Sequence, residues 1–193
     1  ADDCYWIPPY AHEDIICGQG TAALEAFEQV DNINALFAPC GGGGLLSGSL
    51  ISARAVSPET RVIGVEPLNA NDVASSLKAG EIQRLPQSPD TLADGAATMA
   101  TYPLNFHYLQ QLDEFYEVDE SAIAYWTQWL GHLLKLRIEP TSAMSMDAAV
   151  RWLKTQTKRQ QIMVILSCGN IDVAHMRRIY NEDYLSISPT LRY

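Results

Sequence analysis

The sequence predicts an α/β fold: an open, mainly parallel twisted sheet with helices on both faces, which makes three layers. Two observations predict it. Residues 34–40 and 61–66 are short apolar runs typical of buried strands, and a helical segment separates them. A run of four glycines, Gly41–Gly44, stands between the first strand and that helix. A strand, a glycine turn, a helix and a second strand within about 35 residues form a βαβ unit, whose strands run parallel.

Each further element follows from a boundary signal or an apolar pattern. A helix is expected from the Gly18–Thr21 segment to about Val30, with Thr21 as its N-cap. The helix after the glycine loop runs from Leu45 to about Val56. The sequence then predicts a short helix at residues 72–79, a loop at 81–104, a short strand at 115–118, a helix at 119–136 capped by Asp119, a helix from Pro140 to about 155, a buried strand at 161–167 and a helix at 171–180.

Length, charge and composition exclude several classes of binding partner. The 193 residues suit one domain or one lobe of a larger protein, and a net charge of −10 disfavours nucleic acid and anionic lipid. No apolar run approaches the roughly 20 residues that span a bilayer, and the first residues lack a signal-peptide pattern. The four cysteines form no metal-binding or redox pair. We therefore expect a cytoplasmic protein with no nucleic-acid or membrane partner.

The glycine loop, Gly41–Gly44, predicts a phosphate site. Glycine lets several backbone N–H groups approach a guest closely, and the N-terminus of a helix attracts anions. The loop lacks the Gly-Lys-Ser/Thr ending of a P-loop and the G-x-G-x-x-G spacing of nicotinamide sites. A flexible linker is the alternative, although linkers are usually longer and richer in serine.

Two other predicted strands also end in polar residues. Glu66 and Asp72 flank a turn after the second strand, where carboxylates and a loop carbonyl could bind Mg²⁺ or Ca²⁺, although the spacing also fits a solvated acidic turn. Ser167 ends the last strand, where its neutral hydroxyl suits a ring nitrogen that stays unprotonated or caps the next helix. Ligands of open α/β sheets bind at the carboxyl ends of strands, so these ends predict one site.

Six segments occur in an order that is informative as a set. They are the Pro8-Pro9 to Gly18-Gln19-Gly20-Thr21 region, the glycine loop, Val65-Glu66-Pro67, Thr91–Gly95, Ile138–Thr141 and Leu166–Asp172. Together they resemble the fold type II pyridoxal-phosphate enzymes, in the serine/threonine dehydratase and serine racemase branch. The resemblance covers almost the whole chain.

The resemblance implies a role for each candidate residue. The cofactor would be pyridoxal 5′-phosphate, with its phosphate held by the backbone N–H groups of Gly41, Gly42, Gly43, Gly44 and Leu45. Ser167 would contact the pyridine nitrogen. Glu66, the carbonyl of Ala70 and Asp72 resemble the divalent-cation site of the racemase-like subgroup, which implies Mg²⁺ or Ca²⁺ there.

The sequence departs from the family in three places. The family carries its cofactor on a Schiff-base lysine in a Ser-Phe-Lys-x-Arg-Gly-like motif, and no segment here resembles it. Cys168 and Ser142 each stand where the family usually has glycine. We therefore expect residues 1–193 to be the C-terminal portion of the large cofactor-binding domain of an incomplete fold type II unit. The small domain and the N-terminal segment with the lysine would be absent, so the isolated chain would be inactive.

The implied activity is that of an ammonia-lyase (dehydratase) acting on serine, threonine or 3-hydroxyaspartate, which gives a 2-oxo acid and ammonia. Partners would be the amino-acid substrate, the missing N-terminal segment and a second copy in a homodimer. A serine or aspartate racemase of the same family and a non-catalytic phosphate-binding module are alternatives. A nucleotide-binding domain, in which Glu66 reads a ribose, is a third.

Overall fold

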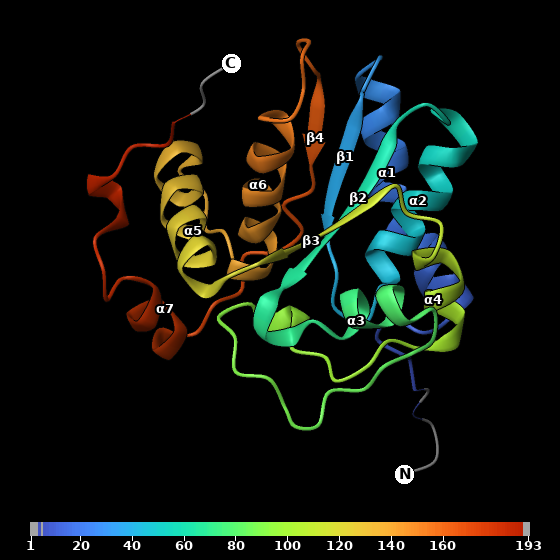
Figure 1. The fold of residues 1–193 in the computed structure, drawn as a ribbon, viewed down its shortest axis with the longest axis horizontal. Coiled ribbons are helices and arrows are strands. Elements are labelled where there is room, and N and C mark those ends of the chain that lie inside the picture. Colours follow the sequence, from blue (N-terminus) through green and yellow to red (C-terminus); the bar gives the residue numbers. More distant parts are fainter. Residues whose placement is uncertain (1–3, 5, 191–193) are drawn as a thin grey trace.

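A four-stranded parallel sheet forms the centre of the molecule (Figure 1). The structure, a computed structural model, describes residue 4 and residues 6–190. The strand order is β3-β2-β1-β4, with β1 at Ala35–Pro39, β2 at Arg61–Pro67, β3 at Glu114–Val118 and β4 at Ile162–Val164. The pairings of β1 with β2, of β1 with β4 and of β2 with β3 are parallel. The predicted α/β fold is confirmed.

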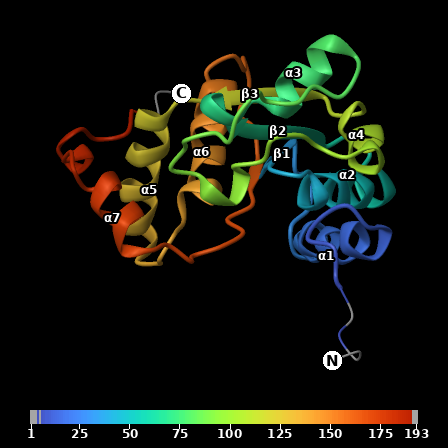
Figure 2. The same cartoon turned by 90° about the horizontal axis from the view of Figure 1, so that it is seen from below.

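Helices cover both faces of this sheet (Figure 2). The helices are α1 (Glu13–Gln29), α2 (Gly44–Val56), α3 (Asp72–Ala79), α4 (Pro103–Leu109), α5 (Glu120–Leu134), α6 (Pro140–Leu153) and α7 (Val173–Ile179), with short 3₁₀ turns at Leu68–Ala70, Asp94–Ala96 and Tyr184–Ser186. Helix α6 packs on one face with α5 beside it, α2 packs on the other face, and α1 covers α2. No helix in the described ranges is long and apolar enough to cross a membrane.

The core follows from the alternation of side chains along the strands. In β1, Phe37 points into a cluster with Met144 and Trp152 of α6, whereas Leu36 joins a cluster with Leu46 and Leu50 of α2. Successive side chains of a strand point to opposite faces, so continuous apolar runs are needed where both faces are covered. The sheet is therefore the middle layer of three.

Helix α1 begins earlier than the sequence predicts. The helix starts at Glu13, with His12 as its N-cap, so the prediction that Thr21 caps a helix beginning at Gly18–Thr21 is wrong. Glycine is unfavourable inside an isolated helix, but here Gly20 lies against Gly48 of α2, where an added Cβ would be 2.7 Å from the Gly48 carbonyl oxygen. The glycine is thus needed for a close helix crossing and does not start the helix.

The bounds of β4 and α4 also differ from the prediction, whereas the predicted start of α5 is confirmed. Strand β4 has only three residues, all half-buried, because it lies at the sheet edge and pairs with β1 alone among the described residues. Helix α4 starts at Pro103, inside the segment expected to be a loop. The predicted cap of α5 is confirmed, since the Asp119 carboxylate accepts a hydrogen bond from the Ala122 amide at 2.9 Å.

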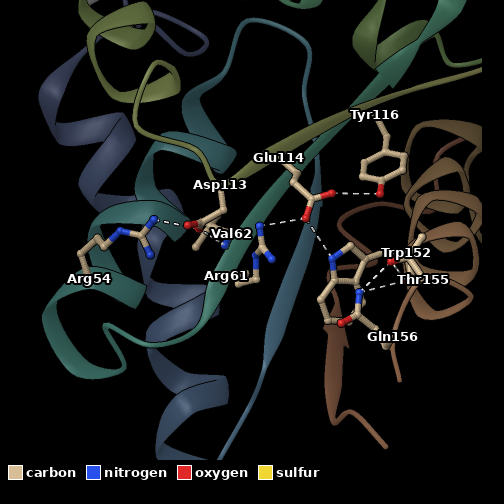
Figure 3. A network of polar contacts seen from close by, with 9 residues as sticks. All are labelled: Arg54, Arg61, Val62, Asp113, Glu114, Tyr116, Trp152, Thr155 and Gln156. Atoms are coloured by element: carbon tan, nitrogen blue, oxygen red, sulfur yellow. Dashed lines mark hydrogen bonds and ion pairs between the residues drawn. The ribbon is translucent and has the colours of Figure 1, made fainter. Parts of the chain in front are cut away.

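Edge strand β3 is fixed by two carboxylates at its amino end (Figure 3). Asp113 accepts hydrogen bonds from the backbone N–H of Val62 at 2.7 Å and from Arg54 at 2.8 Å. Glu114 Oε1 lies 3.0 Å from Arg61 Nη2 and accepts from Trp152 Nε1 at 3.1 Å. These contacts join β3 to β2, α2 and α6 at the end of the sheet opposite the candidate site.

Candidate functional site

The carboxyl ends of three strands lie side by side at one end of the sheet. Phe37 of β1 pairs with Val164 of β4, and Pro39 of β1 pairs with Val65 of β2. The strands are parallel, so the segments that follow them all begin at the end of the sheet where the strands have their carboxyl ends. The glycine loop after β1, Ser167 after β4 and Glu66 at the end of β2 are thereby brought to neighbouring positions.

The glycine loop has no room for side chains. Gly43 has a φ of 94°, in the left-handed region that favours glycine, and it caps α2. A Cβ on Gly41 would lie 2.8 Å from the carbonyl oxygen of Gly95, and one on Gly42 would clash with the Tyr10 ring. The tetraglycine sequence is therefore a requirement of this backbone path.

The N–H groups of this loop are available to a ligand. Within the described part of the chain, the backbone N–H groups of residues 41–45 have no hydrogen-bond partner, and no side chain caps α2. Gly42, Gly43 and Gly44 are nevertheless buried residues. Buried N–H groups are rarely left unpaired, and a row of them at a helix N-terminus suits an anion.

Two side chains, one from α4 and one from the segment before it, hold the glycine loop by hydrogen bonds to a backbone carbonyl. Asn105 Nδ2 donates to the Gly42 carbonyl at 2.7 Å, and Thr101 Oγ1 donates to the same oxygen at 3.2 Å. The Gly42 carbonyl and the Gly43 N–H belong to one trans peptide plane and point in opposite directions. By binding the carbonyl, Asn105 and Thr101 therefore turn the Gly43 N–H to the other side of the loop.

Glu66 and Asp72 are buried carboxyl groups. They are 1% and 0% exposed, so the alternative of a solvated acidic turn is wrong. Glu66 accepts hydrogen bonds from the amides of Val73 and Ala74 at 3.3 and 2.7 Å, which fixes the start of α3. Burial raises the pKa of Glu66 to about 9 and that of Asp72 to about 6, with the nearby Asp72 charge also raising the pKa of Glu66.

Asp72 has one oxygen that the described residues leave without a partner. Its Oδ1 accepts from Thr98 Oγ1 at 3.0 Å, whereas its Oδ2 is buried and has no hydrogen bond there. Ala70, the third predicted cation ligand, is fully buried at the end of the 3₁₀ turn between β2 and α3. No cluster of three or more His, Cys, Asp or Glu side chains suited to a metal occurs in the described ranges.

Ser167 is held by a residue of α6. The Oγ atoms of Ser142 and Ser167 lie 3.1 Å apart, and Ser142 Oγ also accepts from the Cys168 amide at 3.0 Å. The following helix, α7, is capped by Asp172, whose carboxylate accepts from the His175 amide at 2.7 Å. Ser167 is therefore not a helix cap, and that alternative is wrong.

A chain of contacts connects the glycine loop with Ser167. Gly41 lies against the backbone of Gly95, whose N–H donates to Thr141 Oγ1 at 3.1 Å. Thr141 is followed by Ser142, the partner of Ser167. The glycine loop, the turn at Asp94–Ala96, the start of α6 and the end of β4 thus surround one region.

Sequence reasoning missed several residues that support this region. They are Thr98, Thr101, Asn105 and the hydroxyl contact of Ser142. The first three bind Asp72 or Gly42, which lie 26 to 63 residues away in the sequence, and they belong to no motif, so no local signal could have identified them. Ser142 carried a signal, since it replaces a glycine expected from the resemblance.

Comparison with known proteins identifies the family. Residues 1–169 match the family described as "Pyridoxal-phosphate dependent enzyme". The chain is 38% identical to the serine racemase of Dictyostelium discoideum over 183 residues, which cover 92% of this chain and 56% of that protein. It is also 38% identical to the L-threo-3-hydroxyaspartate ammonia-lyase of Saccharomyces cerevisiae, over 86% of this chain and 51% of that protein.

The same relationship is seen in three dimensions. The solved structure of the Dictyostelium discoideum serine racemase superposes with a TM-score of 0.81 at 38% identity, over 88% of this chain and 54% of that one. The chain spans about half the length of the curated relatives it matches. The chain belongs to the fold type II pyridoxal-phosphate-dependent enzymes, in the serine/threonine dehydratase and serine racemase family.

Proposed function

We propose that this chain forms part of an ammonia-lyase that converts serine, threonine or 3-hydroxyaspartate into a 2-oxo acid and ammonia. The observation that carries the proposal is the row of N–H groups at residues 41–45, at the start of α2, which have no hydrogen-bond partner among the described residues. The 38% identity to a protein named L-threo-3-hydroxyaspartate ammonia-lyase supports the reaction class.

The residues present fit pyridoxal phosphate. The N–H groups of Gly41–Leu45 would hold its phosphate, and the N-terminal end of α2 would favour the negative charge. The Ser167 hydroxyl would form a hydrogen bond with the pyridine nitrogen without adding charge to it. When bound, pyridoxal phosphate supplies an electron sink that stabilises removal of the substrate α-proton.

A divalent cation, Mg²⁺ or Ca²⁺, would bind to Glu66, the Ala70 carbonyl and Asp72. The buried Asp72 Oδ2, which has no hydrogen-bond partner in the described part of the chain, supports this, because a buried carboxylate needs a proton, a donor or a cation. Burial also raises the pKa values of both carboxyl groups, because it disfavours their charged forms. Glu66 already accepts two amide hydrogen bonds but keeps further lone pairs for a cation.

We also propose that residues 1–193 are the C-terminal portion of the large cofactor-binding domain. The lysine that carries the cofactor would lie on an N-terminal segment outside this chain, so the chain alone would be inactive. The match to about half of each relative supports this division. The half-buried apolar residues of edge strand β4 are also consistent with further covering structure.

Racemisation of serine is the second candidate activity, favoured by the equal identity to a serine racemase. The two outcomes differ after the α-proton has been removed. Loss of the β-hydroxyl leads to the 2-oxo acid, whereas return of a proton on the opposite face inverts the amino acid. Both use the same phosphate and ring-nitrogen contacts.

The test uses the full-length protein loaded with pyridoxal phosphate. Serine, threonine and 3-hydroxyaspartate are each supplied, and 2-oxo acid, ammonia and the opposite enantiomer are measured. We expect 2-oxo acid and ammonia in equal amounts from at least one substrate. A folded protein that binds the cofactor and converts none of the three would contradict the lyase and racemase proposals and favour a non-catalytic module.

A further inference from the structure

We infer that Ser142 is a positioning residue that directs the Ser167 hydroxyl proton toward the pyridine nitrogen. The inference rests on the proposed function, because it requires pyridoxal phosphate in the site with Ser167 at its ring nitrogen. It concerns a residue that the resemblance does not predict, since the family usually has glycine at position 142.

The donor and acceptor roles follow from the contacts of Ser142. The backbone N–H of Cys168 can only donate, so Ser142 Oγ is the acceptor of that 3.0 Å hydrogen bond. The Ser142 hydroxyl proton then has two possible acceptors, Ser167 Oγ at 3.1 Å and the Cys168 carbonyl at 3.4 Å. The shorter contact favours donation to Ser167.

Donation from Ser142 decides what Ser167 can do. A serine hydroxyl has one proton to donate. If Ser167 Oγ accepts from Ser142, its own proton is free for an acceptor in the site. An unprotonated pyridine nitrogen is an acceptor, whereas a protonated one is a donor. The arrangement therefore favours the unprotonated ring.

The donor side of this contact is buried and fixed. Ser142 is 0% exposed and lies in the first turn of α6, where its own N–H donates to the Glu139 carbonyl at 3.1 Å. The Ser142 end of the contact is therefore shielded from water and its backbone position is fixed, whereas Ser167 itself is exposed in this chain.

Helix α6 offers a matched control. Ser145, three residues further on, is also 0% exposed, but its hydroxyl has no hydrogen-bond partner among the described residues. Removing either hydroxyl deletes one buried oxygen from the same helix. Only the Ser142 hydroxyl contacts Ser167, so a difference between the two variants reports on that contact.

The experiment compares Ser142→Ala, Ser142→Gly, Ser145→Ala and Ser167→Ala in the full-length protein loaded with ¹⁵N-labelled pyridoxal phosphate. The ¹⁵N resonance of the pyridine nitrogen reports its protonation, and a cofactor titration gives the dissociation constant. For both Ser142 variants we expect the resonance to move toward that of the protonated ring. Cofactor binding should weaken about 2- to 10-fold, the effect of one net hydrogen bond.

The variants separate the two proposals. Ser145→Ala should leave the resonance and the dissociation constant unchanged. If Ser167→Ala moves the resonance but both Ser142 variants behave like Ser145→Ala, the inference is wrong while the proposed Ser167 contact stands. If Ser167→Ala also leaves the resonance unchanged, the Ser167 contact is wrong and the inference is overturned with it.

Discussion

Gly48 of α2 lies against the backbone of Gly20 in α1. An added Cβ on Gly48 would be 2.5 Å from the Gly20 nitrogen and also too close to the Ile16 carbonyl. Both neighbours are backbone atoms, so a side chain here cannot be accommodated by a rotamer change. The crossing of α1 over α2 therefore requires glycine on both helices.

Replacing Gly48 by alanine should destabilise the protein. The added methyl group would force α1 away from α2, and such overpacking typically lowers the free energy of unfolding by about 1–3 kcal/mol. Urea denaturation measures the change. Gly18→Ala is the matched control, because Gly18 lies in α1 with nothing within 4 Å of its missing Cβ. That variant should be neutral or slightly stabilising, and an equal loss in both would contradict the crossing argument.

This crossing also explains which elements could be predicted from the sequence. Strands β1 and β2 and helix α2 have strong local signals, a continuous apolar run or a glycine turn, and their bounds are predicted closely. Strand β4 is predicted at 161–167 but is shorter, at Ile162–Val164. The start of α1 was predicted wrongly because Gly18 and Gly20 are ordinary helix breakers by local propensity. Tertiary packing against Gly48 overrides that propensity, and a single sequence does not contain the identity of the packing partner.

The residues of the candidate site also fall into those that could be predicted from the sequence and those that could not. Glu66, Ser167 and the glycine loop follow predicted strands, so their convergence could be predicted from the topology. Asn105 could not, because it reaches Gly42 from a helix 63 residues further along the chain. No motif marks such a contact, although it determines the direction of a predicted binding group.

Replacing Asn105 by alanine should weaken cofactor binding. The Gly42 carbonyl would lose its 2.7 Å donor and the Tyr10 carbonyl its 3.2 Å donor, so the loop would no longer hold the Gly43 N–H in one direction. We expect the dissociation constant for pyridoxal phosphate to rise about 3- to 30-fold, as for the loss of one or two buried hydrogen bonds. A fluorescence titration of the full-length protein measures it.

Asn69→Ala is the control for this prediction. Asn69 Nδ2 also donates to a backbone carbonyl, that of Asp90 at 3.1 Å, but the contact is exposed and does not involve the glycine loop. The dissociation constant of the Asn69→Ala variant for pyridoxal phosphate should equal that of the unchanged protein. If Asn105→Ala binds the cofactor as tightly as Asn69→Ala, the loop does not depend on the Asn105 contact.

The stabilising effect of Mg²⁺ should increase with pH. The pKa of Glu66 is raised from 4.5 to about 9 in the folded protein, so the folded state holds a proton that the unfolded chain releases. Without a cation, stability is therefore lost as the pH rises from 4.5 through about 9. Asp72, raised from 3.8 to about 6, acts in the same direction over its lower range. A cation would take the place of these protons.

Melting temperatures between pH 6 and 9, with and without Mg²⁺, test this linkage. The shift caused by Mg²⁺ should be small at pH 6 and grow toward pH 9. Glu66→Gln removes the titration while keeping an oxygen for the Ala74 amide, so it should flatten the metal-free pH dependence and reduce the Mg²⁺ shift. A shift that is equal at all pH values, or unchanged in Glu66→Gln, would place any Mg²⁺ effect at other residues.

Replacing Asp113 by alanine should loosen strand β3 and leave cofactor binding unchanged. Asp113 accepts from the Val62 amide and from Arg54 at the amino end of the sheet, and the substitution leaves that amide without its partner (Figure 3). We expect the free energy of unfolding to fall by about 1–3 kcal/mol, the cost of an unsatisfied, partly buried polar group. Asp31→Ala, at an exposed residue, should cost much less. A change in cofactor affinity without a change in stability would contradict the separation between this network and the site, because the two lie at opposite ends of the same parallel strands.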